Sequence, residues 1–227
     1  MRQDDAQDDR PLKTRSGHGI DVAVQREDYL DGSAIRQIRT LIAGRGTARA
    51  LDAACAAGGQ ARRMAKAGAA VTAVDLHYDG GALLRAAADE GLKQIDFVQA
   101  DLRNPALYRR FGQFDLIIAQ RFIHYLPFPE AVNVVRLFRD ALLPGGTLYL
   151  SASGLGSELG QQYDGAAHIA ERFAPLWPPM ANKHGIHGRV CLYEEHDMRA
   201  LLEASGLRVE KLYASPFGNL KCIACVA

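Results

Sequence analysis

The sequence predicts an α/β protein built on a mostly parallel sheet, with helices on both faces and an antiparallel hairpin at its end. Between residues 48 and 151, apolar strand-like segments alternate with helical segments, a rhythm typical of parallel strands joined by right-handed crossovers. The last two apolar segments, Leu207–Tyr213 and Asn219–Val226, are separated only by a turn around SPFG. Because so short a connection cannot make a parallel crossover, we expect these two segments to pair antiparallel.

Apolar periodicity and the residues that start or stop helices define the elements. We expect a first helix that Ser33 caps and that runs to about Ala43, where Gly44 and Gly46 end it. The expected strands of the parallel part are Ala48–Ala53, Val71–Asp75, Ile95–Ala100, Phe114–Ala119 and Thr147–Ser151. The further helices that we expect are Gln60–Ala67, Gly81–Asp89, Pro105–Phe111, Pro129–Leu142 and Glu195–Ala204.

The size and charge of the chain limit its class. Its 227 residues suffice for one α/β domain, expected at 19–227, and are few for two. The net charge is +1 and the basic residues are spread along the chain, so neither nucleic acid nor a membrane surface is predicted as a partner. Residues 1–18 are polar and are expected to form a disordered or loosely attached tail. Because we find no apolar leader or span, we expect a cytoplasmic location.

The cysteines and histidines do not predict a metal site. Cys222 and Cys225 have C-x-x-C spacing but stand in an apolar strand, where residues three apart point to opposite faces. We therefore expect buried, reduced thiols. His184 and His187 are close in sequence, but no third ligand stands near them and no helix is expected to fix their geometry.

Two acidic residues end consecutive strands, and a loop of very small residues follows the first. ALDAACAAGG places Asp52 before Ala54, Ala56 and Gly58, and AVDLH contains Asp75. Small residues let a backbone approach a ligand, and a carboxylate after the second strand suits a ribose diol. The pattern resembles the S-adenosylmethionine site of class I methyltransferases, whose loop reads Asp-x-Gly-x-Gly-x-Gly. Alanine stands at the first two glycine positions, where its methyl group disfavours positive φ.

The resemblance spans roughly Tyr29–Val226 and implies the seven-stranded Rossmann-like sheet of that family, with S-adenosylmethionine as cofactor. VQADLRN resembles the segment that meets the adenine, and FDLIIAQRFIHYLP resembles the fourth strand with its following turn. The implied cofactor-binding residues are Asp52, Ala54 and Gly58 at the methionine end, Asp75 and Leu76 at the second strand, Asp101 and Leu102 at the adenine, and Gln120 at the carboxyl edge of the fourth strand.

The resemblance also implies methyl transfer to a small-molecule acceptor. His124 is the candidate catalytic base, because its side chain titrates near neutral pH and it follows the fourth strand closely. The alternative is that it packs behind the cofactor. Residues 152–193 interrupt the strand–helix rhythm and are expected to form a lid or acceptor region. The candidate acceptor-binding residues are Tyr29, Tyr163, Trp177 and His187.

Two other interpretations stay open at this point. A non-catalytic relative that keeps the fold but has lost the cofactor would explain Ala54 and Ala56. A nicotinamide oxidoreductase would need G-x-G-x-x-G after the first strand, which this chain lacks. The sequence predicts neither the identity of the acceptor nor the oligomeric state.

Overall fold

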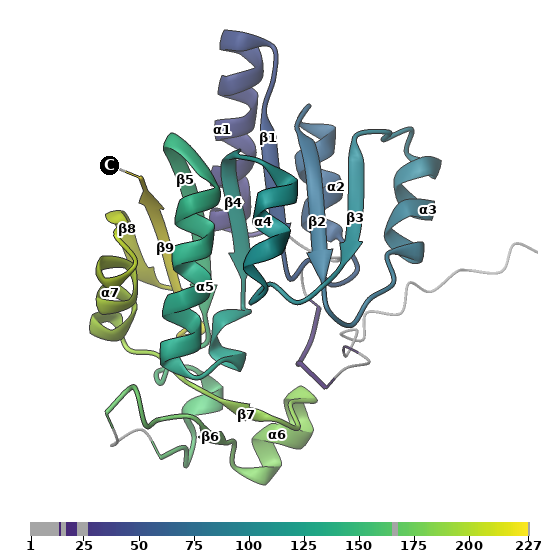
Figure 1. The fold of residues 1–227 in the computed structure, drawn as a ribbon. Coiled ribbons are helices and arrows are strands. Elements are labelled where there is room, and N and C mark those ends of the chain that lie inside the picture. Colours follow the sequence, from purple (N-terminus) through teal and green to yellow (C-terminus); the bar gives the residue numbers. More distant parts are fainter. Residues whose placement is uncertain (1–13, 15–16, 22–26, 165–167, 227) are drawn as a thin grey trace, which may run out of the picture.

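The computed structural model describes residues 14, 17–21, 27–164 and 168–226 (Figure 1). Of the tail expected at 1–18, Thr14, Gly17 and His18 are therefore the described part, and the rest of that prediction lies outside the described residues. The centre of the molecule is a seven-stranded sheet with the order β3-β2-β1-β4-β5-β9-β8. Its strands are β1 (Arg49–Ala53), β2 (Ala70–Asp75), β3 (Ile95–Gln99), β4 (Phe114–Gln120), β5 (Leu142–Ala152), β8 (Arg208–Ala214) and β9 (Leu220–Cys225).

The directions of the strands confirm the predicted fold class. The pairs β1–β2, β1–β4, β2–β3 and β4–β5 are parallel, whereas β9 runs antiparallel to both β5 and β8. The last strand in the chain is thus inserted between β5 and β8. The strand order reverses between β1 and β4, so the connections that follow these two neighbouring strands leave in opposite directions. Open α/β sheets bind ligands at the carboxyl ends of strands at such a point.

Helices cover both faces of the sheet (Figure 1). One apolar core packs α4, α5 and α7 against the sheet, and the other packs α1, α2 and α3. The helices are α1 (Tyr29–Arg45), α2 (Gly59–Lys66), α3 (Gly81–Asp89), α4 (Pro105–Phe111), α5 (Phe128–Ala141), α6 (Pro178–His184) and α7 (Glu195–Ala204), with the 3-10 turns η1 (Ile123–Tyr125) and η2 (Glu158–Gly160).

The start of α1 differs from the prediction. Asp28, and not Ser33, is the N-cap, and its side chain accepts hydrogen bonds from the backbone of Leu30 and Asp31. The Asp31 carboxylate in turn accepts from the Asp28 amide at 3.0 Å, which completes a capping box. Ser33 lies inside the helix, where its hydroxyl donates to the Tyr29 carbonyl at 2.7 Å. The helix therefore begins at Tyr29, one turn earlier than expected.

Residues 152–193 form a small substructure below the sheet in Figure 1. They contain η2, α6 and a two-stranded ribbon of β6 (Ala174–Pro175) and β7 (Arg189–Val190). Their apolar side chains pack into a third core of their own, which contains Leu159, Tyr163, Leu176, Ile186, Val190 and Leu192. The buried guanidinium of Arg172 contacts the Asp197 carboxylate of α7 at 2.6 Å and thereby ties this substructure to the main domain.

Candidate active site

A cavity of about 570 Å³ lies at the carboxyl edge of the sheet. Residues that follow β1, β2, β3 and β4 form one wall, and the start of α1 with the β8–β9 turn forms another. Thr14, His18, Ile20 and Asp21 line it from the N-terminal side. The volume suits a cofactor together with a small acceptor.

The loop after β1 has the backbone shape of the glycine-rich loop that it resembles. Ala54, Ala56 and Gly58 have φ values of 59°, 47° and 77°. The expectation that alanine would disfavour positive φ is therefore overridden here, at a cost of about 1–2 kcal/mol per alanine. Gly58 does not itself line the cavity, and an added Cβ at this position would come within 2.3 Å of Leu83 Cδ1. Such strain, kept at a ligand edge, is a mark of a functional loop.

Asp75 ends β2 with its carboxylate held by two backbone amides. Ala56 donates to Oδ2 at 2.9 Å and His77 donates to Oδ1 at 2.8 Å. Each oxygen has a further lone pair, so the fixed carboxylate can still accept a pair of ligand hydroxyls. The bond to Ala56 also links this strand end to the loop after β1.

Asp52 is the most unusual carboxylate of the cavity. It is 5% exposed, and its Oδ2 has no hydrogen-bond partner among the described residues. Burial, and then the neighbouring Asp31 carboxylate, raise its pKa to about 8. Asp31 is itself buried, and its Oδ1 accepts from Gln120 Nε2 at 2.5 Å. An orphan acceptor in an acidic pocket fits a cationic ligand group.

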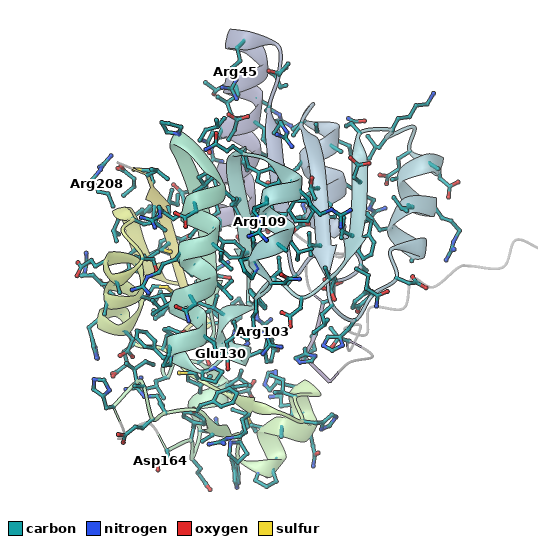
Figure 2. All side chains as sticks on the ribbon, in the orientation of Figure 1. Arg45, Arg103, Arg109, Glu130, Asp164 and Arg208 are labelled. Atoms are coloured by element: carbon teal, nitrogen blue, oxygen red, sulfur yellow. The ribbon has the colours of Figure 1, made fainter. Side chains whose placement is uncertain are left out.

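The segment after β3, which the sequence predicted to meet the adenine, lies on the cavity wall. Asp101, Leu102 and Leu76 all line the cavity. The Asp101 carboxylate accepts from Arg103 Nη2 at 2.7 Å, which lowers its pKa, and Arg103 also contacts Glu130 at 3.0 Å. Figure 2 shows Arg103 and Glu130 close together at the end of the sheet that faces the substructure.

The opposite end of the cavity combines aromatic rings with an ion pair. Tyr29 is 52% exposed, and its ring packs edge-on against Tyr213 with centroids 5.8 Å apart. Phe217, in the β8–β9 turn, is 66% exposed and also lines the cavity. Lys221 of β9 is buried and pairs with the Asp28 carboxylate. This end offers an apolar surface beside charged groups.

Besides Gly58, four residues predicted for the site do not line the cavity. His124 in η1 is fully buried; its Nε2 lies 3.4 Å from Ser153 Oγ, and burial holds its pKa well below 6.5. Tyr163 is buried in the third core, where its hydroxyl donates to the Val190 carbonyl at 2.6 Å. Trp177 caps α6 and His187 is exposed next to Gly17. None of the four lines the cavity that the described residues form.

The substructure at 152–193 contacts residues 17–21, and these residues in turn line the cavity. His187 donates its amide to the Gly17 carbonyl at 3.2 Å, and Gly19 donates to the Gly185 carbonyl at 3.2 Å. His18 then lies in the cavity wall, stacked on His77 with ring centroids 4.8 Å apart. Residues 17–21 therefore separate the substructure from the cavity.

Sequence reasoning missed several residues of the cavity wall, including Asp31, Lys221 and Arg121. Two of them carried a local signal. Asp28 and Asp31 have capping-box spacing, and Lys221 is the one charged residue of the strand LKCIAC, where a charge is unexpected unless it has a partner. Arg121 carried no such signal, because its unusual φ of 52° is visible only in the structure.

Comparison with known proteins agrees with this architecture. Residues 50–146 match the family described as the methyltransferase domain. A curated relative, the ubiquinone biosynthesis O-methyltransferase of Escherichia coli, is 30% identical over 103 residues, which are 45% of this chain and 42% of that protein. The match therefore spans less than half of the relative's length.

Solved structures share the fold. An S-adenosylmethionine-dependent methyltransferase from Clostridium acetobutylicum superposes with a TM-score of 0.67 at 13% identity, covering 91% of this chain and 94% of that one. The magnesium protoporphyrin IX methyltransferase of Synechocystis, solved with bound S-adenosylhomocysteine, gives 0.61 at 17% identity and covers 94% and 92%.

Residues 50–146 thus match a methyltransferase domain, and the chain has the fold of solved S-adenosylmethionine-dependent methyltransferases, in agreement with the resemblance in the sequence. Among the described residues, no helix has the length and apolar character needed to cross a bilayer.

Proposed function

We infer that this protein binds S-adenosylmethionine in the cavity and transfers its methyl group to a small-molecule acceptor. The observation that carries the proposal is Asp52: a buried carboxylate with an unpartnered oxygen, at the start of a strained loop, on the wall of a cavity. The cofactor carries an ammonium and a sulfonium, and the carboxylates of Asp21, Asp31 and Asp52 line the same cavity. Binding of these cationic groups would favour the ionised form of Asp52, whose pKa is about 8 in the free protein, and the carboxylates would then complement both groups.

Each wall residue has a role that its geometry supports. Asp52 would accept a hydrogen bond from the cofactor's ammonium, while the loop with Ala54 and Gly58 lets the backbone come close to the methionine end. Asp75, fixed by two amides, would accept the ribose hydroxyls. Asp101 and Leu102, with Leu76, would hold the adenine, and Gln120 would orient Asp31 at the methionine end.

When bound, S-adenosylmethionine supplies a methyl group that its sulfonium has already activated. The residues of this chain would therefore have to orient the acceptor and exclude water rather than supply a strong acid or base. The neutral, buried His124 is consistent with this, because it does not line the cavity and packs behind Tyr125, which does. The positive φ values of Ala54 and Ala56 argue against the non-catalytic alternative, since the loop keeps its shape without the glycines.

Equilibrium binding of S-adenosylhomocysteine, measured by calorimetry, tests the proposal. We expect the wild-type protein to bind, and Asp75→Ala to weaken binding about 10- to 100-fold, as expected for hydrogen bonds to a charged group. Asp96→Ala is the matched control, because Asp96 is an exposed residue of β3 outside the cavity wall. If the wild type fails to bind at millimolar ligand, the non-catalytic alternative replaces this proposal.

A further inference from the structure

Arg121, the residue directly after β4, is held in a strained conformation on the cavity wall. Its φ is 52°, in the left-handed region that favours glycine. Two hydrogen bonds fix it there: its amide donates to the Ser151 carbonyl and to Ser151 Oγ, both at 3.0 Å. An arginine side chain gains nothing from this backbone shape, whereas glycine would adopt it freely.

The guanidinium of Arg121 also has a buried donor, Nε, without a hydrogen-bond partner among the residues that the structure describes. Three lysines and arginines of the described residues line the cavity. Arg103 pairs with Asp101 and Glu130, and Lys221 pairs with Asp28. Arg121 contacts no carboxylate of the described residues, and its buried Nε has no hydrogen-bond partner there. A partly buried guanidinium with an unsatisfied donor lacks the anion that its planar geometry suits.

We propose that Arg121 binds a carboxylate of the methyl acceptor, so that the acceptor is an anionic molecule built on an apolar, ring-like frame. This rests on the proposed function. The guanidinium can donate two parallel hydrogen bonds to a carboxylate, which fixes both the position and the orientation of the bound molecule. Strain of this kind persists where the residue is needed for function.

The exposed rings at the cavity mouth support a ring-like frame. Tyr29 and Phe217 are two of the four large apolar side chains that stand out as exposed in the described chain, and both line this cavity. Lys211 Nζ lies 4.1 Å from the centroid of the Tyr29 ring and donates to its hydroxyl at 3.0 Å, so the ring is held in place. Rigid aromatic surfaces of this kind bind flat apolar ligands.

Binding of benzoate to protein saturated with S-adenosylhomocysteine, followed by ligand-observed NMR, tests the proposal. Benzamide has the same frame without the charge. We expect benzoate to bind at least tenfold more tightly than benzamide, and Arg121→Met to remove this preference. Arg121→Lys keeps the charge without the planar fork, so its benzoate affinity should be intermediate. Arg109→Met is the matched control, because Arg109 is an exposed residue on α4 (Figure 2) and does not line the cavity.

Arg121→Gly separates a functional role from a structural one. Because glycine adopts the observed φ freely, this variant should melt at the wild-type temperature or above while losing benzoate about 10- to 100-fold. Its affinity for S-adenosylhomocysteine should stay within twofold of the wild type. Equal benzoate affinity in Arg121→Gly and wild type, or no benzoate binding to the wild type at millimolar concentration, would overturn the proposal.

Two further outcomes keep this proposal distinct from the proposed function. If Arg121→Gly loses S-adenosylhomocysteine but keeps benzoate, Arg121 belongs to the cofactor site and the acceptor proposal fails. If the wild type does not bind S-adenosylhomocysteine, the proposed function fails, and the benzoate titration on the protein alone still decides whether Arg121 is a carboxylate site.

Discussion

Replacing Asp52 with asparagine should stabilise the protein and weaken its cofactor site. The pKa of this carboxyl is raised from 3.8 to about 8, first by burial. In the unfolded chain the group is ionised above about pH 4, so folding at pH 7 requires proton uptake. At about 1.4 kcal/mol per pKa unit, this lowers the free energy of unfolding by at most about 4 kcal/mol at pH 7. The asparagine side chain does not titrate, so folding of the Asp52→Asn variant requires no proton uptake at this position.

The sign of the pH dependence follows from the raised pKa. Stability associated with protonated Asp52 is fully present below about pH 4 and is lost as the pH rises towards 8. The advantage of Asp52→Asn should therefore be small near pH 4.5 and largest near pH 8. We expect a gain of about 1–4 kcal/mol at pH 7, which corresponds to a rise in Tm of about 3–12 °C for a domain of this size.

Thermal unfolding of the ligand-free protein, measured between pH 4.5 and 8, checks this. Asp96→Asn, an exposed carboxylate on β3, is the control and should show no such trend. The reasoning is refuted if Asp52→Asn melts at or below the wild-type temperature at pH 8, or if its advantage does not grow with pH. The same variant should bind S-adenosylhomocysteine at least tenfold more weakly, because an amide cannot ionise to pair with the ammonium when the ligand binds.

Three further substitutions address other parts of the structure. Gly58→Ala should lower the free energy of unfolding by about 2–4 kcal/mol, because the added Cβ would meet Leu83 and the φ of this residue is positive. Denaturant unfolding measures this change, and an unchanged midpoint would contradict the prediction. Arg172→Met leaves the buried Asp197 carboxylate without its arginine and should lower the free energy of unfolding by about 3–5 kcal/mol. Hydrogen exchange should then rise first within residues 168–193, and unchanged protection in that range would contradict the prediction. Tyr163→Phe should cost about 1–2 kcal/mol and leave S-adenosylhomocysteine affinity unchanged in calorimetry, whereas an affinity loss would restore the predicted role of Tyr163 in the site.

The sequence predicted the parallel part of the sheet well, because its signals are local. Each strand there is a short apolar run, and the small residues between Asp52 and Gly58 mark the turn into α2. The β8–β9 hairpin was also predictable, since the length of a turn limits the direction of the next strand. The start of α1 was misplaced because Ser33 and Asp28 are both capping residues, and the choice between them depends on the partner Asp31.

The part of the cavity where we propose that the acceptor binds could not be predicted from the sequence, because its residues meet through long-range contacts. Lys221 reaches Asp28 across 193 positions of the chain, and Arg121 is placed by Ser151 of β5. The aromatic residues of 152–193 looked like an acceptor lid, yet many of the apolar groups there pack on one another in the third core. Composition does not distinguish a ligand-binding wall from a small self-contained core, since both need the same side chains.

The position of β9 has a consequence for how the domain is made. A ribosome delivers β8 before β9, yet β8 joins the sheet only through β9, which lies between it and β5. Until residue 225 has emerged, the nascent chain exposes unpaired edges on β5 and β8, the kind of surface that recruits chaperones or neighbouring chains. Docking of β9 closes both edges and brings Lys221 to Asp28 in the same movement. Docking of β9 therefore completes the part of the cavity wall that Lys221 and Asp28 form, and a chain stalled or clipped before β9 would hold Asp52, Asp75 and Asp101 without that part of the wall.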